Sequence, residues 1–356
     1  MKFTLPFFKK KDVVGLDIGS NSIKLIHLIQ GKRGWQLINL GIAPLPPDAI
    51  VDASIIDSMT VTNTIRELVE SHDVTVKDTV SALPGQMVII KKVGLPAMTE
   101  EELAESIQWE AEKYIPFPVA DVNIDFQILG TEGEGKGRME VMLVAVKKDV
   151  INDYTNVIVE AGLNPVVVDV DAFALENMFE VNYTTGPNEN VAIVNIGASF
   201  MTMSILMGGV TTFTRTAPVG GNIFTEGIQK QLNVSFKDAE TLKLGGKVEG
   251  VDGREVSSIM ERVSDNMSME IKRSIDFFLG GGSGGYVTKI YLSGGCSKVK
   301  GLATAIQGKT DVVVELVNPF SNVVYNPKVF DPNYIKEVSP LFTVGVGLAI
   351  RRLGDR

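Results

Sequence analysis

One sixteen-residue pattern occurs twice in this chain, and it constrains the fold more than any other feature of the sequence. VVGLDIGSNSIKLIHL, residues 13–28, matches VAIVNIGASFMTMSIL, residues 191–206, in its apolar and polar positions without a gap. Asp17 aligns with Asn195, and Gly19 aligns with Gly197. Each copy predicts a strand, a small polar tip and a second strand. A chain that carries the same supersecondary unit twice is expected to contain its own fold twice.

Length and charge narrow the possible functions. The 356 residues are enough for two domains with separate cores. A net charge of -9 argues against a nucleic-acid-binding protein, because no basic field is present to neutralise phosphates. The single cysteine, Cys296, excludes an intramolecular disulfide, and the Cys and His residues have no zinc-binding spacing.

The two ends of the chain predict a soluble, intracellular protein. MKFTLPFFKKKD has its apolar residues before its lysines, the reverse of a signal peptide, and nowhere do 18 uncharged apolar residues run together. Phe7, Phe8 and the lysines could contact an anionic membrane surface, although a frayed lead into the first strand is the preferred interpretation. The chain stops at AIRRLGDR, directly after the last predicted helix, so membrane association is expected to depend on a partner.

Periodicity predicts the elements of the first half. We expect an antiparallel meander of three strands, then a helix and a short strand, over residues 13–18, 23–29, 35–42, 60–71 and 79–83. A strand, a helix and two more strands follow between Gln86 and Val146. The helix TEEELAESIQWEAEKYI opens with Thr99 and Glu102 in capping-box spacing, and DVNIDFQIL alternates before its hairpin partner RMEVMLVAV. This order predicts a small subdomain inserted into the first domain.

The second half repeats the opening pattern and then becomes helical. GNIFTEGIQKQL, FKDAETLKL and a long segment from Arg254 towards Leu279 predict helices, and KIYLS predicts a strand. Residues 340–352 predict a final helix.

The polar tips suggest a phosphate site. Small residues let backbone N–H groups approach a phosphate, and the hydroxyls of Ser20 and Ser22 can add donors. Asp17 fits such a site if a divalent cation lies between its carboxylate and the phosphates. Two tips that face each other across a cleft would clasp a nucleotide polyphosphate. The glycines of LSGG, residues 292–295, would allow an adenine ring or ribose to approach closely, although a tight strand-to-helix connection is the simpler alternative.

Five motifs together resemble the superfamily of actin, sugar kinases and heat-shock ATPases: DIGSNSIK, NIGAS, GGN, AETLK and SGGCSKVKGL. The inserted subdomain resembles that of the cell-division protein FtsA, and EKYIPFP with VVDVDAFALEN resembles the PilM family of type IV pilus assembly proteins. The resemblance covers nearly the whole chain. It implies an α/β, actin-like (ribonuclease H-like) two-lobed fold, with duplicated βββαβα-type domains and an FtsA-like 1C insertion.

The resemblance also implies subdomain boundaries. Subdomain 1A comprises residues 1–84 and 164–188, and the 1C insertion comprises residues 85–163. Domain 2, with parts 2A and 2B, comprises residues 189–340. The C-terminal helix, residues 341–356, returns to 1A.

Family membership places ATP and Mg²⁺ between the lobes. The implied role of Asp17 is that of the metal-side carboxylate. The resemblance implies a first phosphate loop of Gly19, Ser20, Asn21 and Ser22, with Lys24 as the basic residue near the phosphates. Gly197, Ala198 and Ser199 would form the second loop, after Asn195. The other implied nucleotide-binding residues are Gly220, Gly221 and Asn222; Glu240 and Lys243 at the ribose or base; and Gly294, Gly295 and Ser297 at the adenosine. Alternatively, Lys24 is a surface lysine, and Glu240 with Lys243 is a solvated i, i+3 pair.

One position departs from the superfamily pattern. Asn195 stands where an aspartate is usual, and an amide supplies neither negative charge nor a base. We therefore expect ATP to act mainly as a conformational ligand with slow or absent turnover, and the catalytic residue stays unknown. Asp169 and Asp171 are the two plausible candidates for the general base of a sugar- or acetate-kinase-like phosphotransferase. Alternatively, the two residues form a turn at the end of a strand, with an aspartate that caps the next helix.

The family implies a scaffold at the inner membrane of the pilus machine that binds the cytoplasmic N-terminal peptide of PilN. Other platform and motor proteins and a homo-oligomer or ring are further expectations. A groove between 1A and 1C would be lined by Ile89, Ile90 and Val93, although these residues fit an ordinary core strand equally well. An FtsA-like division filament and the phosphotransferase are the alternative functions.

Overall fold

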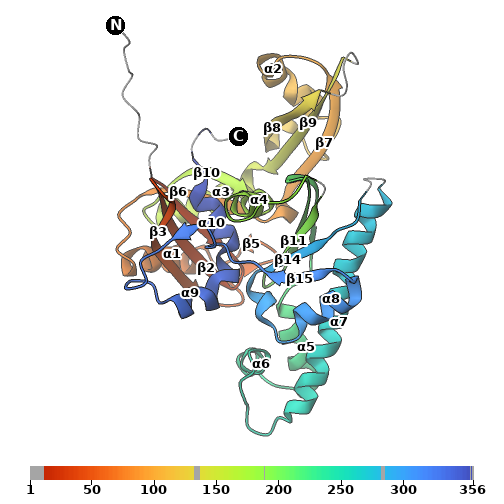
Figure 1. Ribbon diagram of the computed structural model, residues 1–356. Helices are drawn as coiled ribbons and strands as arrows, with labels where there is room; N and C mark the ends of the chain where they lie inside the picture. The colour runs from red at the N-terminus through yellow and green to blue at the C-terminus, as the bar shows by residue number, and fades with distance from the viewer. Residues whose placement is uncertain (1–11, 132–136, 188, 282–284, 353, 355–356) are drawn as a thin grey trace.

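The computed structural model describes residues 12–131, 137–187, 189–281, 285–352 and 354, which form two lobes and a projecting arm (Figure 1). Phe7, Phe8 and the lysines of the N-terminal segment lie outside the described residues, as do parts of the two glycine-rich turns after residues 131 and 281. Within the described ranges, no helix is both long and apolar enough to cross a lipid bilayer.

The first lobe is built on a mixed sheet with the strand order β10-β6-β1-β2-β3-β16. The predicted meander is present: β1 (Val14–Ile18), β2 (Ser22–Gly31) and β3 (Gly34–Pro44) pair antiparallel. β6 (Asp78–Leu83) and β10 (Asn164–Val170) extend the sheet in parallel. The apolar side chains of β1 all belong to a core shared with α1 and α3. β2 adds Ile23 and Leu25 to that core, and its Ile26 and Leu28 belong to a second core with α4 and α10.

The second lobe repeats this topology. Its sheet has the order β13-β12-β11-β14-β15, which corresponds strand for strand to β3-β2-β1-β6-β10. The five strands are β11 (Asn190–Ile196), β12 (Met201–Met207), β13 (Val210–Ala217), β14 (Lys289–Ser293) and β15 (Val313–Leu316). The gap-free match of the sequence is confirmed, because Gly19 N–H donates to Ser22 O and Gly197 N–H donates to Phe200 O at equivalent positions.

The arm is the inserted subdomain. Its sheet has the order β7-β9-β8, with β7 (Val88–Pro96), β8 (Val122–Thr131) and β9 (Arg138–Lys147) all antiparallel to their neighbours. α2 (Glu100–Ala111) packs on it through Leu103 and Ile107, and Thr99 and Glu102 make both bonds of the predicted capping box. The arm therefore has an apolar core of its own.

Helices surround the two large sheets. α1 (Ser58–Ser71) is capped by Asp57 and packs beside α3 (Lys148–Glu160), whose buried residues belong to the core of the first lobe. The second lobe is covered by α5 (Asn222–Leu232), α6 (Phe236–Lys243), α7 (Gly253–Gly280) and α8 (Leu302–Thr310). α9 (Pro332–Val338) follows β16 (Val323–Val324), and a small hairpin joins β4 (Ile50–Val51) to β5 (Ser54–Ile55).

Two helices connect the lobes. α4 (Asp171–Asn182) and α10 (Thr343–Ile350) pack against each other in a core that includes residues of both large sheets, such as Ile26 and Ile193. A Cβ on Gly347 would overlap the carbonyl oxygen of Ala174, so the two backbones approach as closely as glycine permits. The predicted final helix over residues 340–352 is shorter than expected, because residues 339–342 form a 3₁₀ turn that contains Pro340.

Candidate functional site

The first tip carries a partly buried ion pair. Asp17 at the end of β1 is the register partner of Lys24 on β2, and Lys24 Nζ lies 3.2 Å from Asp17 Oδ2. Both side chains are mostly shielded from solvent, at 18% and 14% exposure, so Lys24 is not a surface lysine. Asn21 O accepts the N–H of Leu45, and Ser22 is buried. Asn21 is nevertheless exposed, and Gly19 and Ser20 are half-buried, so these three residues are the accessible positions of this tip.

The second tip is joined to the predicted GGN motif. Gly221 N–H donates to Gly197 O at 2.9 Å, and Asn222 N–H donates to Ala198 O at 2.8 Å. The Asn222 side-chain amide also donates to Ser199 Oγ at 3.3 Å. A Cβ on Gly220 would overlap Ala198 O. GGN thus packs directly on the loop of the second tip and starts α5 there.

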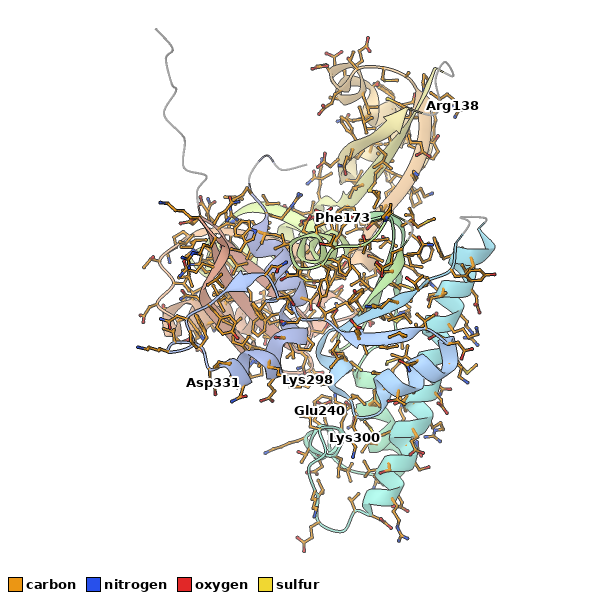
Figure 2. The ribbon with its side chains drawn as sticks, viewed as in Figure 1. Arg138, Phe173, Glu240, Lys298, Lys300 and Asp331 are labelled. Carbon is orange, nitrogen blue, oxygen red and sulfur yellow. The ribbon has the colours of Figure 1, made fainter. Side chains whose placement is uncertain are left out.

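A polar cluster lies beside these loops. Lys243 Nζ donates to Glu240 Oε1 at 2.5 Å and to Thr225 Oγ1 at 3.0 Å, and the Thr225 hydroxyl also bonds Glu240. Thr225 is buried, and Lys243 Nζ would lie 3.8 Å from a Cβ on Gly221. Glu240 lies on the second lobe (Figure 2). The pair belongs to a partly buried network next to GGN, not to a solvated helix face.

The LSGG motif closes the same region. Gly294 has φ +84°, its N–H donates to Pro340 O, and a Cβ there would overlap Ile196 O. Gly295 has open space where a Cβ would stand. Ser297 is buried, and its hydroxyl donates to Gly294 O at 2.6 Å, so this hydroxyl supports the turn. Burial also raises the pKa of the neighbouring Cys296 thiol to about 12.

Asp171 is a site residue that the sequence suggested only for one alternative function. It is the first residue of α4, and its Oδ2 accepts a hydrogen bond from Thr202 Oγ1 at 3.0 Å. Thr202 is the register partner of Asn195 and the counterpart of Lys24 in the second repeat. Burial raises the pKa of Asp171 to about 6; the Thr202 hydrogen bond lowers it, and the charge of Asp17 adds to the rise. The Asp171 carboxylate therefore lies close to both tips.

Asn195 has a fixed partner. Its Oδ1 accepts the hydroxyl of Ser293 at 3.0 Å. Among the described residues, no group of three or more His, Cys, Asp and Glu side chains gathers as a metal cage.

A groove separates the arm from the first lobe. A cavity of about 310 Å³ lies between the edge strand β8 of the arm and the edge strand β10 of the first sheet. The arm contributes Asn123 to Gln127, Met142, Val144 and Val146; the first lobe contributes Leu83, Ile151, residues 167–170, Phe173 and Arg351. Phe173 lies at the root of the arm (Figure 2). Arg351 Nε lies 2.9 Å from the buried Asp169 Oδ2.

The three residues that the sequence suggested for a peptide groove do not line this cavity. Ile89, Ile90 and Val93 belong to β7, on the opposite side of β9 from β8, and none of them lines this cavity. Val93 is buried in the core of the arm, and Ile89 packs against that core. Ile90 packs against the core of the first lobe.

The YIPFP motif lines a second cavity. It has a volume of about 270 Å³ and lies between Phe117, Pro118 and Asp121 on one side and Lys147 to Asp149 on the other. Lys147 Nζ stands 4.2 Å from the Phe117 ring centroid, and Lys148 Nζ donates to Ala120 O at 2.6 Å. These contacts fasten the motif to the junction of β9 and α3.

Comparison with known proteins identifies the family. A family model described as "Type IV pilus assembly protein PilM" matches residues 15–353. The chain belongs to this family. A solved structure described as "PilM-PilN type IV pilus biogenesis complex" contains a chain 29% identical to this one, with a TM-score of 0.86, and the match covers 97% of this PilM-family chain and 100% of that chain. The predicted resemblance is confirmed, and with it the two-lobed actin-like fold.

More distant relatives are similar over most of the chain. EutJ from Carboxydothermus hydrogenoformans shares the fold at 15% identity and a TM-score of 0.58, over 96% of this chain and 89% of its own. The cell division protein FtsA of Enterococcus faecalis is 25% identical, over 88% of this chain and 80% of its own length. FtsA of Bacillus subtilis is 22% identical, over 94% of this chain and 82% of its own length.

Proposed function

We propose that this PilM-family protein is a cytoplasmic, ATP-binding scaffold of the type IV pilus assembly platform, held at the inner membrane by a partner. The partner is PilN, through its cytoplasmic N-terminal peptide, and nucleotide state modulates that binding. Support comes from the family, from the structure of a similar protein described as a PilM-PilN complex, and from the groove beside the arm.

The groove is the observation that carries the proposal. Its two walls are edge strands, β8 and β10, and an edge strand has unpaired backbone groups that an extended peptide can bond. Val144, Val146 and Phe173 offer apolar surface to alternate side chains of such a peptide. Asp125, Asp169 and Arg351 supply charges along the same walls.

The loops of the two tips fit a nucleotide. Gly19, Gly197 and Gly221 place no side chain over these loops, and their own N–H groups bond within the loops, which fixes the loop conformation. Lys24 and Lys243 place two cations beside the loops. The open space beside Gly295 suits an adenosine. Asp17 would hold hydrated Mg²⁺, which when bound would neutralise phosphate charge.

The peptide site can be tested by calorimetry. The probe is a synthetic peptide with the N-terminal cytoplasmic sequence of PilN from the same organism, titrated with and without Mg·ATP. Met142→Lys on the groove wall should weaken binding at least about tenfold, because a lysine would put a charge among apolar contacts. Ile89→Lys, on β7, should leave the affinity unchanged, which separates this groove from the wall that the sequence suggested. Equal effects of both substitutions would contradict the assignment.

The role of ATP can be tested separately. Asn195 offers no negative charge at the second tip, so we expect turnover slower than about one per minute, far below the roughly 1–1,000 per second of typical enzymes. Asn195→Asp keeps the acceptor for Ser293 and adds a carboxylate, and it should raise phosphate release at least about tenfold. A fast wild-type rate, or an unchanged rate in the variant, would refute this view of Asn195.

A further inference from the structure

A single polar rung crosses the sheet of the second lobe. Ser293, Asn195, Thr202 and Thr216 are successive register partners on β14, β11, β12 and β13, so their side chains share one face. Asn195 belongs to the second phosphate tip, and Ser293 is bonded to it. Thr202 reaches out of the sheet and donates to Asp171 Oδ2 of the first lobe at 3.0 Å. The rung thus connects the nucleotide tip to the other lobe.

The far end of the rung touches the root of the arm. Gly85 lies where the chain leaves β6 and enters β7, and a Cβ on it would stand 2.6 Å from Thr216 Oγ1 and 3.1 Å from Asp171 Oδ1. A side chain at Gly85 would therefore force the Thr216 hydroxyl of the second lobe to move, and it would crowd the Asp171 carboxylate. A change in the spacing of the lobes would therefore displace Gly85 directly. Because Gly85 precedes β7, the sheet of the arm would move with it.

The first-lobe side of the contact between Thr202 and Asp171 lies next to the groove. Asp171 begins α4, while Asp169 and Phe173, two residues before and after it, line the groove. Asp169 is held by the N–H of Val170 at 2.8 Å and by Arg351. A short strand-to-helix junction therefore presents Asp171 to the second lobe and its neighbours to the groove, and it cannot shift at one face without shifting at the other.

We propose that this rung, with the β10–α4 junction and Gly85, transmits the occupancy of the nucleotide tip to the width of the groove. The mechanism is a small change in lobe spacing that moves Asp171 and Gly85 together, so that both walls of the groove respond. The nucleotide at the tips and the occupant of the groove both rest on the proposed function, whereas the contacts that join the rung to the groove do not.

The test compares Thr202→Val with the wild type. Valine keeps the shape of threonine and removes only the donor to Asp171. Two quantities are measured: the affinity of the PilN peptide with and without Mg·ATP, and hydrogen exchange of the β8 amides with and without Mg·ATP in the absence of peptide. In the wild type we expect Mg·ATP to change the affinity at least about fivefold and to change β8 exchange. In Thr202→Val both responses should disappear, while Thr212→Val, an exposed control on the same sheet, should keep them.

A second pair of variants guards against simple misfolding. Gly85→Ala should reduce the nucleotide response, because its Cβ meets Thr216 Oγ1, and Thr216→Ala in the same chain should restore much of it. Exchange at β8 that responds to Mg·ATP in a protein that binds no peptide would refute the partner but support the rung. Peptide binding with no dependence on Mg·ATP and unchanged β8 exchange would support the groove and overturn the rung.

Discussion

At the scale of single residues, the two neighbouring glycines of the LSGG motif have different roles, Gly294 in the packing of the backbone and Gly295 in the proposed nucleotide site. A Cβ on Gly294 would overlap Ile196 O, whereas nothing lies near one on Gly295. Gly294→Ala should therefore cost about 3 kcal/mol or more of stability, through strain at φ +84° and displaced backbone. Gly295→Ala should leave the melting temperature unchanged and weaken ATP binding several-fold, because it fills the space proposed for adenosine. Melting curves and nucleotide titrations of both variants check this; unchanged ATP affinity in Gly295→Ala would remove the adenosine from this place.

Asp171 makes stability depend on pH in the nucleotide-free protein. Its pKa rises from 3.8 to about 6 on folding because it is buried, so between about pH 4 and pH 6 the folded state binds more protons than the unfolded state. Stability therefore falls as pH rises through this window, by about 3 kcal/mol for this group. Asp171→Asn should melt near the wild-type temperature at pH 4 and clearly above it at pH 7.5. The exposed Asp276→Asn should show no such difference, and an equal shift of Asp171→Asn at both pH values would contradict the account.

The sequence predicted the residues of the tips better than their orientations. The small residues and the aligned Asp17 and Asn195 followed from the repeat alone, because strand alternation fixes which positions meet across a hairpin. The inward hydroxyls of Ser22 and Ser297 did not, since a serine in a turn can bond either its own backbone or a ligand. Asp171 carried a usable signal, an aspartate at the junction of a strand and a helix.

At the scale of elements, the arm depends on the capping of α2. Thr99 and Glu102 satisfy the first N–H groups of this helix, and Leu103, Ile107 and Ala111 are its buried residues. Thr99→Ala should cost about 1 kcal/mol, and amides of α2 should exchange roughly fivefold faster. Ser106→Ala in the same helix removes a hydroxyl that bonds mainly within the helix, so its amides should exchange no faster. Hydrogen exchange followed by mass spectrometry distinguishes the two.

The elements that the sequence predicted are those with a local cause. The capping box of α2 and the alternation of β8 each lie within a few residues and appear where expected. The groove has no local cause, because its walls come from β8, β9 and β10 and from Arg351, which lies some 180 residues beyond β10. Ile89, Ile90 and Val93 satisfied the same apolar pattern on β7, and the pattern does not state which edge of a sheet is free.

At the scale of the whole molecule, the two lobes meet across α4 and α10. Glycine permits the close approach of these two helices, because a Cβ on Gly347 would overlap Ala174 O. Glycine also lets α10 approach β1 of the first lobe, because a Cβ on Gly15 would stand 2.6 Å from Gly345 O. The helices must therefore separate to admit any side chain at Gly347, and the apolar core that both sheets share would open with them. We therefore expect this crossing to help fix the relative placement of the lobes, because its side chains belong to the core that both sheets share.

Gly347→Ala should consequently lower the free energy of unfolding by about 3 kcal/mol or more, or prevent folding, although alanine is the better helix former. Gly308→Ala supplies the matched control, because Gly308 also lies in a helix, α8, but has nothing within 4 Å of an added Cβ. There the same substitution should be neutral or should stabilise by up to about 1 kcal/mol. Urea unfolding of both variants measures the difference. If Gly347→Ala unfolded at the same urea concentration as Gly308→Ala, the α4–α10 crossing would have room for a methyl group. The lobes would then be positioned instead by the contact of Asp171 with Thr202.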